Sequence, residues 1–272
     1  MFRLSGGMRV ECGGTSVPIE SPPVSGILAA LLFAEGRLLH QDRLVEALWD
    51  DPPRSARSNV RLYLSRLRRD LAKAGPCAAA RLVTQRGCGY GLKAGEDETD
   101  LTRFRKLGVR GTTALRDGDP DTAADVLGEA LELWQGPVGQ GCTASGRLRA
   151  RFQAWDDLCL AVREKYLHAK IVQGHSTDLM PELHTIIGAA PFREASWANL
   201  IRAVYLSGDV SGALAAWQRV TTMLAEELGV DPSANIGDLH LAVLRRDDEA
   251  VRAYVHPAVV GAEAGCAGSA GR

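Results

Sequence analysis

Arginine is concentrated in one short stretch of the chain. Between Arg54 and Arg69 there are six arginines and no acidic residue. A guanidinium group stays charged at physiological pH and can form two parallel hydrogen bonds with a phosphate or with the edge of a guanine base. The stretch therefore indicates a surface for a polyanion.

The spacing of apolar residues places these arginines on one side of a helix. The segment SARSNVRLYLSRLRRDLAKA, residues 55–74, has an apolar stripe that should face a core. The stripe consists of Val60, Tyr63, Leu64, Leu67 and Leu71. At about 100° per residue, the opposite side carries a mainly polar and basic set. That set consists of Ser58, Arg61, Leu62, Ser65, Arg66 and Arg69. A solvated, arginine-rich surface helix is the simpler alternative for the same pattern.

The elements around this helix are those of a winged helix-turn-helix. Glycine pairs separate three short β-like segments, at 2–4, 8–12 and 17–19. Two helices should follow. The first begins after a Ser-Pro-Pro stop at 21–23 and ends near residue 36, and the second spans 41–49. Residues 81–85 and 90–93 can pair as a hairpin around a glycine-rich tip. The third helix would fit the major groove, and Arg86 at the hairpin tip would reach the minor groove.

From residue 97 onward the apolar pattern is helical. Gly118, Gly174 and Gly208 each lie in a small-residue segment between two helical patterns. The last two are 34 positions apart, the tetratricopeptide period, while GPVGQGCTASG at 136–146 interrupts the array.

The predicted fold is therefore mostly α. We expect an α+β winged helix-turn-helix at residues 1–95 and an all-α, tetratricopeptide-like domain of helical hairpins at 98–250. A disordered tail is expected at 257–272.

Charge is segregated between the two predicted domains. Residues 1–95 carry 14 Lys and Arg against 8 Asp and Glu, a net charge of +6, whereas residues 96–272 carry 18 against 25, a net charge of −7. The two charges nearly cancel, so the whole chain has a net charge of only −1. The asymmetry indicates a basic module with a polyanionic partner, joined to an acidic module with another role.

Catalytic, cofactor and metal sites lack their sequence signatures. GHSTD at 174–178 lacks the final glycine and the preceding apolar strand of a nucleophile elbow, and there is no phosphate-binding loop. The six cysteines form no Cys-x-x-Cys pair, and the histidines show no metal-site spacing. We expect no enzyme, no cofactor, no metal and unpaired, mostly buried thiols in a reducing compartment. The tryptophans fall in predicted helices, which favours core packing over ligand stacking. They are Trp49, Trp134, Trp155, Trp197 and Trp217.

Membrane insertion and secretion are not expected. The longest apolar run, residues 27–34, has eight residues, against about 20 for a bilayer-spanning helix. The first residues lack the apolar core of a secretory signal. A cytoplasmic, nucleoid-associated location is expected.

Motifs in both halves resemble one family. DRLVEALWDD at 42–51, YLSRLRRDL at 63–71 and RGCGYGL at 86–92 resemble the OmpR-type winged helix, a two-component-type output domain, of the SARP activators. ALELWQGP at 130–137, WANLIRAVYLSGDVSGALAAWQRV at 197–220 and LAEELGVDPS at 224–233 resemble the bacterial transcriptional activator domain that follows it. The resemblance covers residues 2–247.

The resemblance implies a transcriptional activator of an antibiotic gene cluster. Such a protein would bind direct repeats in double-stranded promoter DNA, as a homodimer on DNA, and would recruit RNA polymerase with its sigma factor. A helical-repeat adaptor for protein interactions, or a ligand-sensing regulator, with only weak DNA binding, is the alternative.

The family pattern also assigns residues to the DNA. It places Ser58, Arg61, Leu62, Ser65 and Arg66 toward the groove, in agreement with the helical spacing. We expect Arg66 to make a bidentate base contact and Leu62 an apolar base contact. Phosphate contacts are expected from Arg57, Arg68 and Arg69. The chain departs from the family where the first helix begins, with Pro23-Val24-Ser25 in place of a basic stretch.

Overall fold

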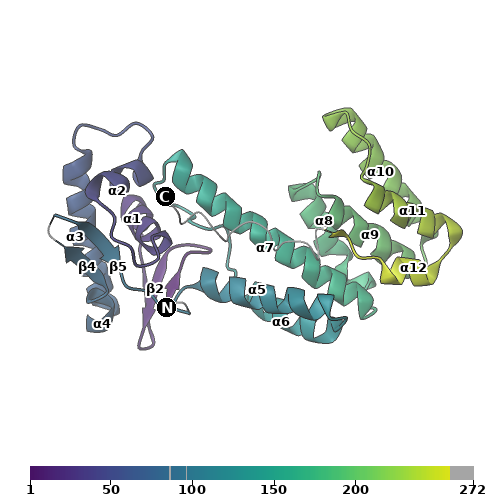
Figure 1. The fold of residues 1–272 in the computed structure, drawn as a ribbon, viewed down its shortest axis with the longest axis horizontal. Helices are drawn as coiled ribbons and strands as arrows, with labels where there is room; N and C mark the ends of the chain where they lie inside the picture. The colour runs from purple at the N-terminus through teal and green to yellow at the C-terminus, as the bar shows by residue number, and fades with distance from the viewer. Residues whose placement is uncertain (86, 96, 258–272) are drawn as a thin grey trace, which may run out of the picture. The chain divides into compact units, whose positions relative to one another are not determined.

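The computed structural model describes residues 1–85, 87–95 and 97–257 (Figure 1). It is mostly helical, with small β-sheets near the N-terminus, which confirms the predicted fold class. Contacts group the chain into two compact units. The first contains Met1–Leu107 and Ala130–Cys159, and the second contains Gly108–Glu129 and the chain from Leu160 onward.

The first unit opens with a small antiparallel sheet. Its strands are β1 (Phe2–Arg3), β2 (Arg9–Cys12) and β3 (Thr15–Pro18), in that order across the sheet. Val10 on the central strand lies opposite Phe2 on one side and Val17 on the other. β1 and β2 lie within the segments predicted from the apolar residues and glycine pairs, whereas β3 begins two residues before the segment predicted at 17–19.

The helices and the wing follow in the predicted order. They are α1 (Pro22–Phe33), α2 (Gln41–Leu48), α3 (Ala56–Ala74), a short α4 (Pro76–Ala79), β4 (Leu82–Gln85) and β5 (Gly89–Leu92). Two features differ from the prediction. The proline pair forms the first turn of α1 instead of stopping the chain before it, because a proline there lacks only an N–H that has no helical partner. The sequence analysis also missed α4.

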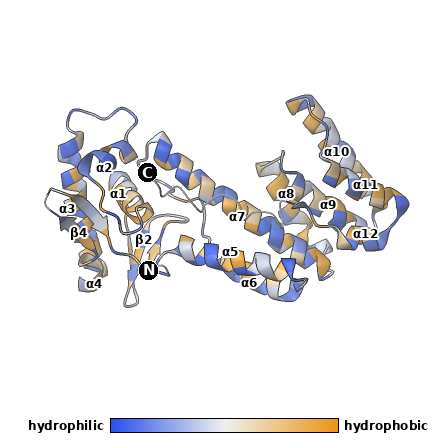
Figure 2. Cartoon of the chain, in the orientation of Figure 1, coloured by the Kyte–Doolittle hydropathy of each residue, from blue (hydrophilic) through white to orange (hydrophobic). Residues whose placement is uncertain are grey.

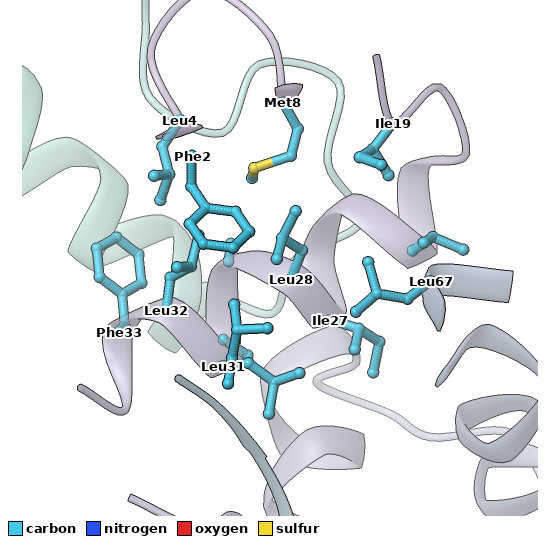
Figure 3. Packing of buried hydrophobic residues seen from close by; sticks show 14 of the residues in the cluster. Phe2, Leu4, Met8, Ile19, Ile27, Leu28, Leu31, Leu32, Phe33 and Leu67 are labelled. Carbon is cyan, nitrogen blue, oxygen red and sulfur yellow. The ribbon is translucent and has the colours of Figure 1, made fainter. Parts of the chain in front are cut away.

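Helix α1 is buried on every side. All its residues from Val24 to Phe33 are buried, and Figure 3 shows Phe2, Leu4 and Met8 gathered over one side of it. Leu67 of α3 packs near Ile27 in the same cluster. A helix that is apolar all round requires cover on all faces, and the sheet, α2 and α3 provide only part of it.

The rest of the cover comes from residues 133–152, here called the covering segment. Thr143 N donates to the carbonyl of Pro22 at 2.8 Å, and Ser145 N donates to the carbonyl of Ala47 at 2.9 Å. The ring of Phe152 lies 5.9 Å from that of Phe33, measured between centroids. The first unit thus extends past the boundary expected at residues 95–98, and it includes the 136–146 stretch that interrupts the helical array in the sequence.

Two carboxylates fasten the winged helix to these later elements. Buried Asp100 accepts the backbone N–H groups of Leu4 and Ser5 at 2.9–3.0 Å and the Ser5 hydroxyl at 2.7 Å. Burial raises the pKa of Asp100, and these hydrogen bonds oppose the rise. Asp50, in the loop between α2 and α3, accepts Gly146 N at 2.8 Å and pairs with Arg149 at 3.0 Å. Asp50 thereby caps the first turn of the helix that starts at Gly146.

The remaining helices form hairpins. They are α5 (Asp100–Arg116), α6 (Pro120–Glu132), α7 (Gly146–Val172), the short η1 (Thr177–Leu179), α8 (Met180–Ala189), α9 (Glu194–Leu206), α10 (Val210–Leu228), α11 (Ala234–Arg245) and α12 (Asp248–Ala253). Gly118, Gly174 and Gly208 adopt φ values of 77°, 91° and 95° in the turns between paired helices. The predicted role of these glycines as hairpin turns is confirmed, because L-residues with a side chain rarely adopt such angles.

The second unit is built around α9. Leu200 and Ile201 lie in its apolar cluster, and Arg202 is completely buried beside them. Arg202 bonds to His168 Nδ1 at 2.8 Å and donates to the Val251 carbonyl at 3.0 Å. Burial lowers the pKa of His168 to about 3, so this ring stays neutral and can accept the bond.

The cysteine, tryptophan and hydropathy predictions have mixed outcomes. Within the described residues, five cysteines lie outside any disulfide: Cys12, Cys77, Cys88, Cys142 and Cys159. Cys77 and Cys88 are exposed, whereas burial raises the pKa of Cys142 to about 12. Trp49 lies directly after α2 and Trp134 two residues after the end of α6, so neither is inside a helix as expected. A search of the described helices finds none long and apolar enough to span a bilayer.

Replacing Gly26 with alanine tests the close approach of α1 to the covering segment. A Cβ atom at this position would lie 2.1 Å from the Thr143 carbonyl oxygen and 2.6 Å from Leu48 Cδ2. We expect Gly26→Ala to lower the free energy of unfolding by about 1–3 kcal/mol, because the backbone on both sides must shift. Urea unfolding of the full chain, followed by circular dichroism, measures the loss.

Gly237→Ala in α11 is the matched control. An added Cβ there meets no described atom within 4 Å, and alanine favours a helix over glycine by about 0.5–1 kcal/mol. Stabilisation by both substitutions would contradict the packing described for α1.

Candidate nucleic-acid interface

Helix α3 has two distinct faces. Its buried stripe packs into the core of the first unit and consists of Ala56, Val60, Leu64, Leu67, Leu71 and Ala74. The predicted DNA-contacting residues on α3 are all exposed: Arg57, Ser58, Arg61, Leu62, Ser65, Arg66, Arg68 and Arg69. Hydrophilic and hydrophobic residues alternate along this helix in Figure 2. All eight side chains are thus exposed on one helix, and six of them form the face that the helical spacing predicts, while Arg57 and Arg68 flank it.

Two of the arginines have partners within the unit. Arg57 Nε donates to Asp42 Oδ1 of α2 at 2.9 Å, which places an acid beside its charge. Arg68 donates to the Thr84 hydroxyl of β4 at 2.9 Å, which joins α3 to the wing. The helical spacing predicts neither partner, since neither Asp42 nor Thr84 is close to α3 along the chain.

Three other arginines have no such partner. Within the described residues, the guanidinium groups of Arg61, Arg66 and Arg69 make no side-chain hydrogen bond or ion pair. Arg66 and Arg69 line a shallow polar hollow, together with Glu20 and Asp70. The acidic pair lowers the net positive charge on this side, while Lys73 is engaged by Asp70 at 2.6 Å.

The uncharged residues on the exposed face of α3 can be approached closely by a ligand. Leu62 is 47% exposed, although a leucine side chain normally favours burial. The Ser58 hydroxyl donates to the Ser55 carbonyl at 2.7 Å and keeps its lone pairs available as acceptors. Ser65 is exposed two turns further along. Together they offer apolar and hydroxyl contacts between the cations.

The wing is held against the loop that joins α1 to α2. Tyr90 of β5 and Leu39 exchange backbone hydrogen bonds at 2.7 Å and 2.9 Å. Gly89 has φ 130° and lies so close to this loop that a Cβ atom would sit 2.3 Å from the Leu39 carbonyl oxygen. Arg86, predicted at the wing tip, lies outside the described residues.

The unusual start of α1 has a structural explanation. Val24 and Ser25 are buried, and the Ser25 hydroxyl donates to the Ile19 carbonyl at 2.6 Å. These residues anchor α1 to the end of β3, so the first turn of α1 offers no cation for a phosphate.

A search for clusters of metal-ligating side chains among the described residues finds none. The chemistry that the face of α3 supports is non-covalent. Guanidinium groups, a hydroxyl and an exposed methyl-bearing side chain can bind a polyanion and contact the edges of bases.

Comparisons with known proteins match both halves of the chain. Residues 21–92 match the family model described as "Transcriptional regulatory protein, C terminal", and residues 99–244 match the bacterial transcriptional activator domain. The regulatory protein MoaR1 of Mycobacterium tuberculosis is 32% identical over 90% of this chain and 79% of its own length. The regulatory protein DnrI of Streptomyces peucetius is 32% identical over 90% of this chain and 92% of its own length.

A solved structure has the same fold. Mycobacterium tuberculosis EmbR, in complex with a low-affinity phosphopeptide, superposes with a TM-score of 0.82 at 31% identity. The match covers 92% of this chain and 67% of that one.

Gly89→Ala tests how the wing is held. The substitution combines a φ value that L-residues rarely adopt with a clash against the Leu39 carbonyl. We expect the amide hydrogens of Leu39 and Tyr90 to exchange faster with solvent, by tenfold or more for a local loss of roughly 1.4 kcal/mol. Hydrogen exchange followed by mass spectrometry measures this change.

Gly87→Ala is the control, because Gly87 has φ 77° but no described atom within 4 Å of the added Cβ. Its effect should stay near the wing tip. If Gly87→Ala exposes the Leu39 amide as much as Gly89→Ala does, close contact with the loop does not hold the wing.

Proposed function

Because the chain belongs to the SARP family of transcriptional regulators, we propose that it activates an antibiotic gene cluster by binding its promoter DNA. In this proposal α3 occupies the major groove and the β4–β5 wing lies against the adjoining minor groove. The bound protein then recruits RNA polymerase holoenzyme, by contacting either the polymerase itself or its sigma factor.

The observation that carries the proposal is the set of unpartnered guanidinium groups on α3. Arg61, Arg66 and Arg69 project from a helix whose other side is fixed in a core. Because the backbone of α3 is already held by the core, binding to DNA orders only the arginine side chains and not the helix itself. Neutralised phosphates release counterions, and affinity should fall with salt with a slope of about −0.9 per phosphate.

The individual roles follow from the position of each residue. We assign Arg66 a bidentate contact with a base and Leu62 an apolar contact with a thymine methyl group. Arg69 and Arg68 contact phosphates, Arg68 from its position beside the wing. Arg57 also contacts a phosphate. To do so, it gives up its ion pair with Asp42 and pairs with a phosphate of the DNA backbone. Arg86 is assigned to the minor groove.

Two molecules would bind directly repeated half-sites as a dimer on the DNA. Their recognition helices would then lie one helical turn apart, or a multiple of it, on the same face of the duplex. The helical hairpins after α5 supply the surface for dimer contacts or for polymerase.

Arg66→Ala and Arg69→Ala separate base recognition from charge. On an operator defined by footprinting the DNA that flanks the gene, Arg66→Ala should cost about 1–3 kcal/mol and relax the preference at one base position. Arg69→Ala should weaken binding to the operator and to a scrambled duplex by similar factors, since phosphates carry no sequence information. Fluorescence anisotropy with both duplexes measures the four affinities.

Arg110→Ala serves as the control, because Arg110 is an exposed arginine on α5 and outside the proposed interface. Its affinity should equal that of the unaltered chain. Equal losses on the operator and the scrambled duplex for Arg66→Ala would refute the base contact.

Spacing between the repeats tests the paired arrangement. Inserting half a helical turn between the half-sites rotates the second one to the opposite face of the DNA. We expect cooperative binding and transcription in a reconstituted polymerase assay to be lost, and insertion of a full turn to restore at least the binding. Undiminished activation after the half-turn insertion rules out the tandem arrangement.

A further inference from the structure

A pocket of about 420 Å³ lies in the first unit, at the C-terminal end of α1. Its walls come from four parts of the chain that are far apart in sequence. The apolar residues that line it are Leu4, Leu32, Phe33, Leu101 and Trp155. The volume is within the range of about 300–1,000 Å³ that is typical of small-molecule sites. Neither the α3 interface nor the wing contributes to it.

Two aromatic rings contribute to the apolar walls. Phe33 ends α1, and Trp155 of α7 is only partly buried although it packs against the core. The ring of Phe33 already has the guanidinium of Arg151 over it, 4.5 Å from the centroid. Flat aromatic molecules gain both apolar contact and ring stacking in such surroundings.

The charged residues at the pocket differ in their partners. Lys106 forms an ion pair with Asp97 at 2.7 Å. Glu35 lies close enough to Arg151 to oppose the fall in that arginine's pKa, so its negative charge is partly compensated. The hydroxyl groups of Thr99 and Thr102 bond to each other at 2.7 Å.

Arg105 stands apart from this set. Its guanidinium makes no hydrogen bond or ion pair with any described residue, although it lines the pocket. Glu35 likewise makes no described hydrogen bond or ion pair, but its charge is offset by the nearby Arg151, whereas no described carboxylate pairs with Arg105. A ligand in the pocket can therefore meet an unpaired cation. Complementarity requires a ligand with an anionic group next to an apolar body.

We propose that this pocket binds a small aromatic organic anion. The ring system packs against Trp155 and Phe33, and the acidic group accepts hydrogen bonds from Arg105. Because the walls come from α1, α5, α7 and the start of the chain, one bound molecule contacts both the winged helix and the elements that cover α1. A ligand that binds only this folded arrangement raises its stability by mass action.

A pair of fluorescent probes tests the site without knowledge of the natural ligand. Anilinonaphthalene sulfonate has an aromatic body with one anionic group, and phenylnaphthylamine has the same skeleton without the sulfonate. Each is titrated into the full-length chain, and the rise in probe fluorescence gives the dissociation constant. We expect saturable binding of the sulfonate at one site per chain.

The charge is tested with Arg105→Gln and, as a matched control, Arg103→Gln on the same helix. Arg103 is exposed and does not line the pocket. Arg105→Gln should weaken binding of the sulfonate by about tenfold, as expected for one charge-assisted hydrogen bond. It should leave phenylnaphthylamine binding unchanged, and Arg103→Gln should alter neither probe. Equal affinity of the sulfonate for all three proteins overturns the proposal.

The location is tested with Ala94→Phe, which places a larger side chain at a half-buried position of the pocket lining. Both probes should lose binding, while the circular dichroism spectrum and the unfolding midpoint of the variant show whether it is folded. A folded Ala94→Phe protein that binds both probes as before overturns the assignment. If this variant does not fold, the Arg105 series still decides the question.

Discussion

The first unit depends on covering one helix that is apolar on every side. Helix α1 cannot present any face to water without exposing several leucines or its phenylalanine, and each large apolar side chain left in water costs about 1.5–3 kcal/mol. The N-terminal sheet, α2 and α3 cover part of it. Residues 133–152 cover the rest, through contacts such as that between Gly26 and the Thr143 carbonyl. The winged helix is therefore completed by residues 133–152, which come well after the end of its last strand at Leu92.

The need to cover α1 also fixes the position of α3. Its apolar stripe packs on α1, and the loop before it carries Asp50, which caps α7. Arg68 adds a bond to the wing at the other end of the exposed face. A helix held at both ends and along one side presents its arginines in a fixed arrangement, which favours recognition of a rigid duplex. The acids at positions 20, 42 and 70 limit how positive that face becomes.

The local patterns in the sequence predict the local structure well. The stripe from Val60 to Leu71 predicts both the helix and its exposed face, and the glycines at 118, 174 and 208 predict the hairpin turns. The alternation near the N-terminus predicts the three strands. Each of these signals depends on residues within a few positions of one another.

The sequence does not predict contacts between distant segments. The 136–146 stretch has no periodicity, so nothing in it indicates that it packs on α1. The ion pair of Arg57 with Asp42 and the bond of Arg68 to Thr84 likewise depend on the final packing. The Pro22-Pro23 pair was misinterpreted for a different reason, since prolines end helices and also begin them.

The distribution of thiols has a practical consequence for labelling. The thiolate is the nucleophile that attacks an alkylating reagent, so the buried Cys142, whose pKa is raised to about 12, stays unreactive at neutral pH while the protein is folded. Cys88 lies exposed in the wing turn, and Cys77 lies exposed on α4. With Cys77 and Cys266 replaced by serine, a maleimide dye should attach chiefly at Cys88, and its emission would then report directly on the surroundings of the wing.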